Sequence, residues 1–291
     1  MQSDALIAPF ERRTVVSTGG VTLVADIGGP EQGPVVVLMH GGGQTRHSWS
    51  GAMAALVGRG YRVINFDARG HGDSSWSNVG AYDLDDRVDD VSAIVGGSSR
   101  YALVGASLGG GTAIHAVARG MRPSAVVLVD IVPHPEPEGI TRIVDFMGRH
   151  TDGFSSLEEA TDAVAAYNPE RPRPNDPNGL MRNLRRSTDG RLHWHWDPRI
   201  LEEMPGMSQA KVLESAKAMA RVEGHPVLVV RGLKSDVVSR GGIERFRELM
   251  PQLEVADVSG AGHMVAGDRN DAFNAAVIAF LEAHMPCEPI S

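Results

Sequence analysis

Residues 101–119, YALVGASLGGGTAIHAVAR, join a short apolar run to a helical pattern through a serine flanked by glycines. The run at 101–105 has the composition of a buried strand, and residues 108–119 are predicted to form a helix. Between them, GASLG matches the pattern G-x-S-x-G. In a strand–turn–helix context this pattern predicts a sharp turn that holds a hydroxyl clear of the sheet, and Ser107 is the candidate nucleophile. A plain glycine-rich helix entry is the alternative.

Alternating strand and helix patterns continue on both sides of this turn. Short β-branched runs such as PVVVLM predict strands buried on both faces, and helical patterns separate them. This alternation predicts an α/β fold in which helices flank a mostly parallel sheet of eight strands. The strands are expected at 13–17, 21–27, 34–39, 61–66, 101–105, 124–130, 225–232 and 253–258.

The alternation stops after Asp130 and resumes near residue 225. Residues 132–222 hold most of the prolines and contain helical pieces such as SLEEATDAVAAY, but no buried β-branched run. Long insertions of this kind are usually lids or binding elements. We therefore expect a core formed by residues 1–131 and 223–291, with a helical lid, or cap, at 132–222 after the sixth strand.

The composition excludes several classes of protein. The chain has 291 residues and a net charge of -8, which disfavours a nucleic-acid partner because phosphate binding requires a basic face. No apolar run is long enough to span a bilayer, and the first residues lack the basic start and apolar core of a secretory signal. We expect no membrane association and a cytoplasmic location. The lone Cys287 permits no disulfide within the chain, and the oligomeric state stays open.

A nucleophilic serine needs a base, and the base needs an orienting carboxylate. His263 follows the last predicted strand, and Asp236 follows the strand before it. In a parallel sheet both loops open at the carboxyl end, where the turn of Ser107 also lies. The order Ser107, Asp236, His263 predicts a triad with His263 as base and Asp236 as the orienting acid. Asp130, which ends the strand VVLVD, is the rival carboxylate.

The glycine-rich stretch HGGG, residues 40–43, follows the third predicted strand. Acyl transfer requires hydrogen-bond donors aimed at the place where the oxyanion forms. The backbone amides of Gly42 and Leu108 are the candidates, whereas His40 is expected to brace the loop. The stretch DARGHGDS, residues 67–74, brings further polar side chains to the same edge, and we expect a structural role for it.

The expected lid contains the stretch HWHWD at 193–197. Its two tryptophans are expected to pack the lid onto the core, with lining of the pocket as the alternative. Its two histidines have no third ligand at a recognisable spacing, so no metal is expected. We expect no other cofactor either. The candidates for the substrate pocket are Gly43, Gln44, Trp194, Trp196 and Met264.

Together, HGGGQTRHSW, DARGHGDS, GASLGG, the strand end near Asp236 and GAGH resemble the α/β-hydrolase superfamily. The resemblance covers residues 14–131 and 223–285, and the subgroup resembled contains lidded serine esterases, lactonases and cofactor-free perhydrolases. Epoxide hydrolases and haloalkane dehalogenases share the scaffold but place an aspartate at the serine position, which disfavours both. By resemblance, the roles fall on Ser107 as nucleophile, His263 as base, Asp236 as acid, and the amides of Gly42 and Leu108 as oxyanion donors.

The resemblance implies hydrolysis of a small-molecule carboxylic ester or lactone through an acyl-enzyme intermediate. Perhydrolysis, thioester hydrolysis and carbon–carbon bond hydrolysis use the same triad and remain alternatives, because such reactions differ in the pocket. A ligand-binding protein without catalysis on the same fold is the alternative from another class. A dinucleotide-binding protein is disfavoured, because GGGQTR at 41–46 lacks the last glycine of G-x-G-x-x-G.

Overall fold

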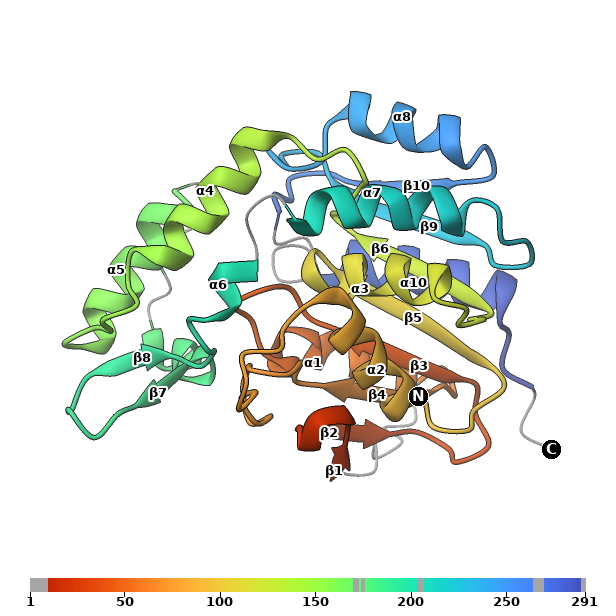
Figure 1. Cartoon of the computed structure of the whole chain (residues 1–291). Coiled ribbons are helices and arrows are strands. Elements are labelled where there is room, and N and C mark those ends of the chain that lie inside the picture. Colours follow the sequence, from red (N-terminus) through yellow and green to blue (C-terminus); the bar gives the residue numbers. More distant parts are fainter. Residues whose placement is uncertain (1–9, 170–172, 174–175, 204–206, 264–269, 289–291) are drawn as a thin grey trace, which may run out of the picture.

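The computed structural model describes residues 10–169, 173, 176–203, 207–263 and 270–288 (Figure 1). Eight strands form one sheet in the order β1-β2-β4-β3-β5-β6-β9-β10. Pairing is antiparallel for β1 with β2 and for β2 with β4, and parallel elsewhere, so the predicted mostly parallel sheet is confirmed. The strands are β1 (Glu11–Val16), β2 (Thr22–Gly28), β3 (Val35–Met39), β4 (Arg62–Phe66), β5 (Tyr101–Ala106), β6 (Ala125–Val129), β9 (Val227–Gly232) and β10 (Glu254–Val258).

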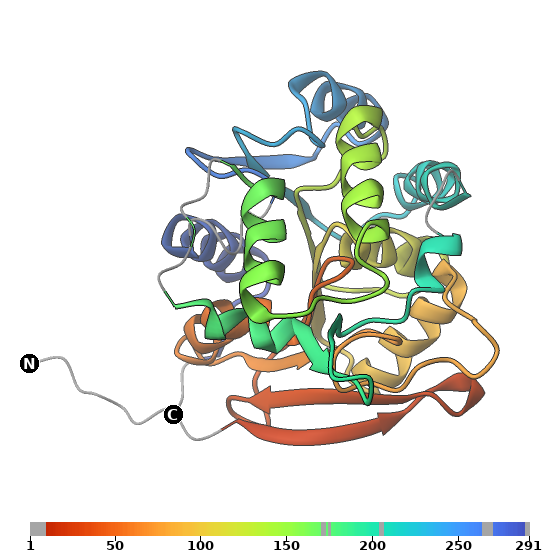
Figure 2. The same ribbon diagram turned by 90° about the vertical axis from the view of Figure 1, so that its left-hand side faces the viewer.

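Helices cover both faces of this sheet (Figure 2). The apolar residues of α2, α3, α7 and α8 share one buried cluster with one face, and those of α1 and α10 share a second cluster with the other. Strands β3 and β6 are fully buried, as their unbroken β-branched sequences predict. The helices are α1 (Ser50–Val57), α2 (Leu84–Val95), α3 (Leu108–Ala118), α7 (Met207–Met219), α8 (Arg240–Leu249) and α10 (Asn270–His284), and short 3-10 turns occupy Thr18–Gly20 and Arg46–Trp49.

The chain between β6 and α7 forms a separate group of elements, which we call the α4–α6 segment (residues 137–203). Figure 1 shows its two main helices and small sheet to one side of the large sheet. Phe154, Trp194 and Trp196 belong to a third buried cluster, formed largely within this segment. The segment contains α4 (Pro137–Gly148), α5 (Leu157–Tyr167), a 3-10 helix (Pro177–Asn183), β7 (Leu184–Arg186), β8 (Leu192–Trp194) and α6 (Ile200–Glu203).

Two features of the range 132–222 differ from the predicted helical lid. Helix α7 packs against α3, and its Val212 lies in the buried cluster of α2, α3 and α8. It therefore belongs to the helical layer of the sheet rather than to an insertion above it. The range also contains the two-stranded sheet β7–β8, which the sequence did not predict. These strands have only three residues each, too few for an alternating pattern to stand out.

No helix among the described residues combines the length and the apolar character needed to cross a membrane.

Candidate active site

The register of the sheet brings several strand ends to one edge. Met39 at the end of β3 pairs with Gly105 of β5. Val129 at the end of β6 pairs with Ala106 of β5 and with Val230 of β9. The loops that follow these parallel strands therefore open side by side, at the carboxyl edge where ligands bind in sheets of this kind.

Ser107 lies in a strained turn between β5 and α3. Its backbone has φ 45° and ψ -108°. Among the described residues other than glycine, only Ser107 and Asp130 have a positive φ. The turn is held by a hydrogen bond from the amide of Ser107 to the carbonyl oxygen of Val129 at 3.1 Å. Strain of this kind collects at functional sites, and here it lies at the ends of two neighbouring strands, β5 and β6.

The glycines around Ser107 are required by close backbone approach. A Cβ atom added at Gly105 would lie 2.3 Å from the carbonyl oxygen of Gly109. One added at Gly109 would lie 2.4 Å from the carbonyl oxygen of Met39. Real Cβ atoms do not approach backbone oxygens so closely. The predicted G-x-S-x-G turn is therefore present, and its glycines let α3 begin directly against β5 and β3.

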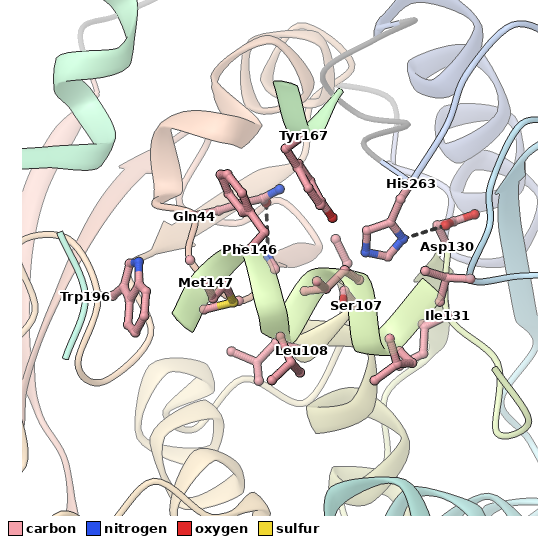
Figure 3. A pocket seen from close by; sticks show the side chains of 18 of the residues that line it. Gln44, Ser107, Leu108, Asp130, Ile131, Phe146, Met147, Tyr167, Trp196 and His263 are labelled. Carbon is pink, nitrogen blue, oxygen red and sulfur yellow. Dashed lines mark hydrogen bonds and ion pairs between the residues drawn. The ribbon is translucent and has the colours of Figure 1, made fainter. Parts of the chain in front are cut away.

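The structure pairs His263 with Asp130 and not with Asp236. The Nδ1 atom of His263 lies 2.7 Å from Oδ2 of Asp130 (Figure 3). The carboxylate of Asp236 instead forms an ion pair with Arg142 of α4, at 2.5 Å. The predicted placement of Asp236 beside His263 is therefore wrong, and the rival carboxylate of Asp130 occupies that place. The role of the orienting acid stays a prediction.

Asp130 is held in position by the end of β9 and the loop that follows it. The hydroxyl of Ser235 donates to its Oδ2 at 2.5 Å, and the amide of Gly232 donates to its Oδ1 at 3.2 Å. The side chain is 1% exposed. Ser235 stands next to Asp236 in the chain, so the loop was correctly placed beside the site, but Ser235 is the residue whose side chain reaches it. No signal in the sequence distinguishes Ser235 from an ordinary loop serine.

The HGGG loop passes directly beside Ser107. A Cβ added at Gly41 would lie 3.6 Å from the Cβ of Ser107. The buried His40 braces this loop, since its Nδ1 donates to the carbonyl oxygen of Gly41 at 2.8 Å and its Nε2 accepts from the amide of Ala68 at 2.9 Å. Burial lowers the pKa of His40, which favours the neutral ring that these bonds need. The predicted bracing role of His40 is confirmed.

A second buried histidine holds the other end of the same loop. The Nε2 atom of His71 accepts from the amide of Gly43 at 3.2 Å, and its Nδ1 donates to the carbonyl oxygen of Arg69 at 3.1 Å. Burial holds the pKa of His71 well below its ordinary value. A neutral histidine with both nitrogens occupied has a structural role.

The rest of the DARGHGDS stretch is also structural. The carboxylate of Asp67 accepts from the amides of Arg46 and Asp73 at 2.7 and 2.9 Å. Arg69 forms a two-pronged ion pair with Asp90 of α2, at 2.7 and 2.8 Å. These bonds connect the loop after β4 to the chain after β3 and to α2, which agrees with the structural role predicted for the stretch.

Both residues that carry the candidate oxyanion donors line the cavity that contains Ser107. Gly42 and Leu108 line it, and neither amide has a hydrogen-bond acceptor among the described residues. The neighbouring amide of Gly41 is occupied, because it donates to Oε1 of Gln44 at 3.2 Å. The two amides are therefore available to a ligand, although a role in catalysis stays a prediction.

The cavity above Ser107 has a volume of about 720 Å³ (Figure 3). Ser107, Asp130 and His263 lie at its floor, and the ring of His263 lies between the other two in Figure 3. The opposite wall comes from α4 and α5. Four predicted pocket residues line the cavity, and the fifth, Met264, falls outside the described residues; the four are Gly43, Gln44, Trp194 and Trp196.

Most of the cavity wall is apolar, and its side chains come from both the core and the α4–α6 segment. The tryptophans of HWHWD line the cavity, and their buried cluster is formed largely by the α4–α6 segment itself rather than by the core, on which they were expected to pack. Within the described residues, no three His, Cys, Asp or Glu side chains are grouped as metal ligands. The apolar wall residues include Leu84, Leu108, Ile131, Val132, Ile140, Ile143, Phe146, Met147, Val164, Val212 and Val237.

Comparison with known proteins places the chain in a family. The model of the alpha/beta hydrolase family matches residues 36–276. The chain belongs to the alpha/beta hydrolase family. Two curated proteins of similar sequence are the esterase Rv0045c of Mycobacterium tuberculosis, 29% identical over 81% of this chain and 78% of its own, and the 2-(acetamidomethylene)succinate hydrolase of Mesorhizobium japonicum, 32% identical over 86% and 88%.

Solved structures of alpha/beta hydrolases have the same fold. The crystal structure of E-2-(acetamidomethylene)succinate hydrolase superposes with a TM-score of 0.80 at 25% identity, over 94% of this chain and 99% of the other. An alpha/beta hydrolase from Novosphingobium aromaticivorans gives a TM-score of 0.81 at 25% identity, over 95% and 99%. The family and these relatives make the chain a hydrolase.

Proposed function

We propose that this alpha/beta hydrolase cleaves a carboxylic ester with Ser107 as nucleophile, His263 as base and Asp130 as the orienting acid. The observation that carries the proposal is the hydrogen bond between His263 and Asp130 in the cavity that also holds the strained Ser107. A serine, a histidine and a buried carboxylate at adjoining strand ends are the parts that acyl transfer requires.

The hydrogen bond fixes the tautomer of the base. A carboxylate only accepts, so Nδ1 of His263 carries the proton and Nε2 carries the free lone pair. Nε2 takes the hydroxyl proton of Ser107 as Oγ attacks the ester carbonyl carbon. The imidazolium that forms is stabilised by Asp130, and it then gives its proton to the leaving alkoxide. Water, activated by the same nitrogen, releases the acid from the acyl-enzyme.

The amides of Gly42 and Leu108 are proposed to receive the negative charge that develops on the carbonyl oxygen. They come from two different strand ends, so they approach one point beside Ser107 from two sides. The buried His40 and His71 hold the glycine loop in place, which keeps such donors pre-organised. Removal of one such donor typically reduces kcat by about 100- to 1000-fold.

The α4–α6 segment is proposed to act as the cap that closes the substrate pocket. Its helices supply the apolar wall opposite Ser107. Pockets with an apolar wall and few polar groups bury the apolar part of a ligand while the polar groups orient it. We therefore expect an uncharged, mainly apolar acyl or alkoxy group. The name of the mycobacterial relative, an esterase, supports an ester substrate.

A panel of substrates tests this function. Purified protein is given short and medium p-nitrophenyl esters, γ- and δ-lactones, a thioester, and acetate with hydrogen peroxide, with Ser107→Ala as the blank for each. We expect ester hydrolysis by the wild type and a loss of about 1000-fold or more in S107A. Turnover only of the thioester, or only of acetate with peroxide, would show that the protein is not an ester hydrolase. The absence of turnover on every substrate would indicate a ligand-binding protein without catalysis.

A further inference from the structure

Asp236 lies at the active-site edge but takes no part in the His263–Asp130 contact. Its carboxylate pairs with Nη2 of Arg142 at 2.5 Å. Asp236 belongs to the loop after β9, in the core, and Arg142 belongs to α4, in the α4–α6 segment. The side chains are 32% and 57% exposed, so the ion pair lies at the surface between these two parts of the molecule.

The same loop makes two backbone contacts with the first turn of α4. The amide of Glu136 donates to the carbonyl oxygen of Val237 at 2.9 Å. Gly139 packs so closely that an added Cβ would lie 2.3 Å from the carbonyl oxygen of Asp236. The start of α4 is therefore seated on residues 236–237, and the ion pair holds the helix one turn further along.

The rest of α4 forms the cavity wall. Ile140, Ile143 and Met147 lie on the side of the helix that faces the cavity. Phe146 stacks on Tyr167 of α5, with ring centroids 4.2 Å apart. The guanidinium carbon of Arg142 lies 5.8 Å from the centroid of the same tyrosine ring, which also lines the cavity.

Three consecutive residues, 235–237, therefore contact both Asp130 and the cavity wall formed by α4. Ser235 donates to Asp130, Asp236 holds Arg142, and Val237 lines the cavity. We propose that Asp236 and Arg142 form a positioning pair that sets α4 over the cavity and so determines how well longer acyl groups are bound. The proposal rests on the proposed ester hydrolysis at Ser107.

The pair acts on binding and not on the chemical step. A short acyl group such as acetyl stays near Ser107, whereas an octanoyl chain reaches the wall formed by α4. Loss of the ion pair lets α4 shift and weakens contacts that only the longer chain makes. Partly exposed ion pairs contribute little free energy, so we expect the KM for p-nitrophenyl octanoate to rise by no more than about fivefold.

The first experiment measures kcat and KM for p-nitrophenyl acetate and octanoate in Asp236→Asn, Arg142→Gln and the double variant. We expect both single variants to raise KM for octanoate and to keep kcat, with acetate kinetics within about twofold of wild type. The double variant is expected to match either single variant, because all three lack the same pair. The exchanged pair R142D/D236R is expected to restore part of the octanoate affinity.

A second measurement does not depend on turnover. Hydrogen exchange of the α4 amides, residues 137–148, is followed in wild type and D236N. We expect faster exchange in the variant, and the same change in wild type when added salt screens the pair. If no ester is cleaved by the wild type, the proposed function fails, while this measurement still decides whether the pair anchors α4.

Glu282→Gln is the matched control. It breaks the ion pair between Arg59 and Glu282, 2.7 Å long and 54% and 48% exposed, which joins the α1 side of the core to α10 away from the cavity. We expect no change in octanoate KM or in α4 exchange. A D236N variant with unchanged octanoate KM and unchanged α4 exchange would overturn the proposal. So would a loss of kcat on acetate comparable to that of D130N, which would make Asp236 the acid.

Discussion

Two residues of the described chain other than glycine have a strained backbone, and both belong to the proposed triad. Ser107 and Asp130 adopt left-handed backbone angles that side chains other than glycine rarely take. They follow neighbouring parallel strands, β5 and β6, and the amide of Ser107 bonds to the last residue of β6. The strained turns at these two strand ends therefore place both side chains in the lining of the same cavity.

Substitution of the two candidate carboxylates, Asp130 and Asp236, should have very different effects on catalysis. Asp130→Asn is expected to reduce kcat on p-nitrophenyl acetate by about 1000- to 10,000-fold, because the amide leaves His263 without its orienting carboxylate. Asp236→Asn is expected to leave that rate nearly unchanged. Steady-state kinetics of the two variants, with circular dichroism as the check on folding, decide between the carboxylates. The reverse ranking would restore Asp236 as the acid.

Ser235 is predicted to position Asp130. Its hydroxyl and the ring of His263 share the same carboxylate oxygen, Oδ2. A hydrogen bond to a charged group is worth about 1.5–3 kcal/mol, so Ser235→Ala should lower the free energy of unfolding by about that amount. We also expect a kcat loss of about tenfold, smaller than that of D130N, with KM unchanged. Equal kcat in S235A and wild type would show that the hydroxyl does not position the acid.

At the scale of elements, the turn from β5 into α3 depends on backbone contact that any side chain would break. Gly109→Ala is expected to destabilise the fold by about 2 kcal/mol or more, because its Cβ would meet the backbone of β3. Urea unfolding measures the change. Gly148→Ala is the matched control, since Gly148 also lies in a helix but an added Cβ meets nothing within 4 Å. Equal stability of the two variants would contradict the close packing.

Most elements could be predicted from the sequence, because their apolar patterns are complete within each element. The β-branched runs of β3 and β6 signal burial on both faces, and both strands are buried as expected. Helix α7 was misplaced in the lid for a different reason. Its burial depends on contact with α3, about a hundred residues earlier in the chain, and no local pattern reports such a contact.

The predicted contact between Asp236 and His263 is absent for a similar reason. Asp130 and Asp236 both follow parallel strands that end at the same edge, so their positions in the sequence are equivalent. What separates them is side-chain direction: the left-handed backbone of Asp130 turns its carboxylate to His263, while Asp236 faces α4. Neither the backbone angle nor the position of α4 can be read from the sequence. Ser107 and His263 could be predicted as candidates because the motif and the chain order point to them, and the structure places both in one cavity.

At the scale of the whole molecule, buried neutral histidines make stability depend on pH. Burial lowers the pKa of His40 and of His71, and the Nε2 atom of each ring accepts a hydrogen bond from a backbone amide. The unfolded chain binds these protons near its ordinary pKa of about 6.5, above the pKa of the folded state. The free energy of unfolding should therefore be highest above about pH 6.5. It should fall as the pH drops below that value, by up to about 1.4 kcal/mol per pH unit for each histidine.

Urea unfolding between pH 7.5 and 5 measures this dependence. His71→Gln can still offer an acceptor to the amide of Gly43, but it does not titrate. We expect it to be less stable than wild type at pH 7.5 and to lose less stability on acidification. An H71Q variant with the same pH slope as wild type would show that His71 does not contribute to the acid sensitivity.

We propose that Ser107 is a nucleophile activated by His263 and Asp130, and labelling with a fluorophosphonate is the direct test of this activation. The probe forms a covalent bond only with an activated serine, and peptide mapping identifies the residue. We expect one adduct on Ser107 in wild type, an equally fast reaction in D236N, a strongly slowed reaction in D130N, and no adduct in S107A. An adduct on any other serine, or labelling of D130N at the wild-type rate, would contradict it.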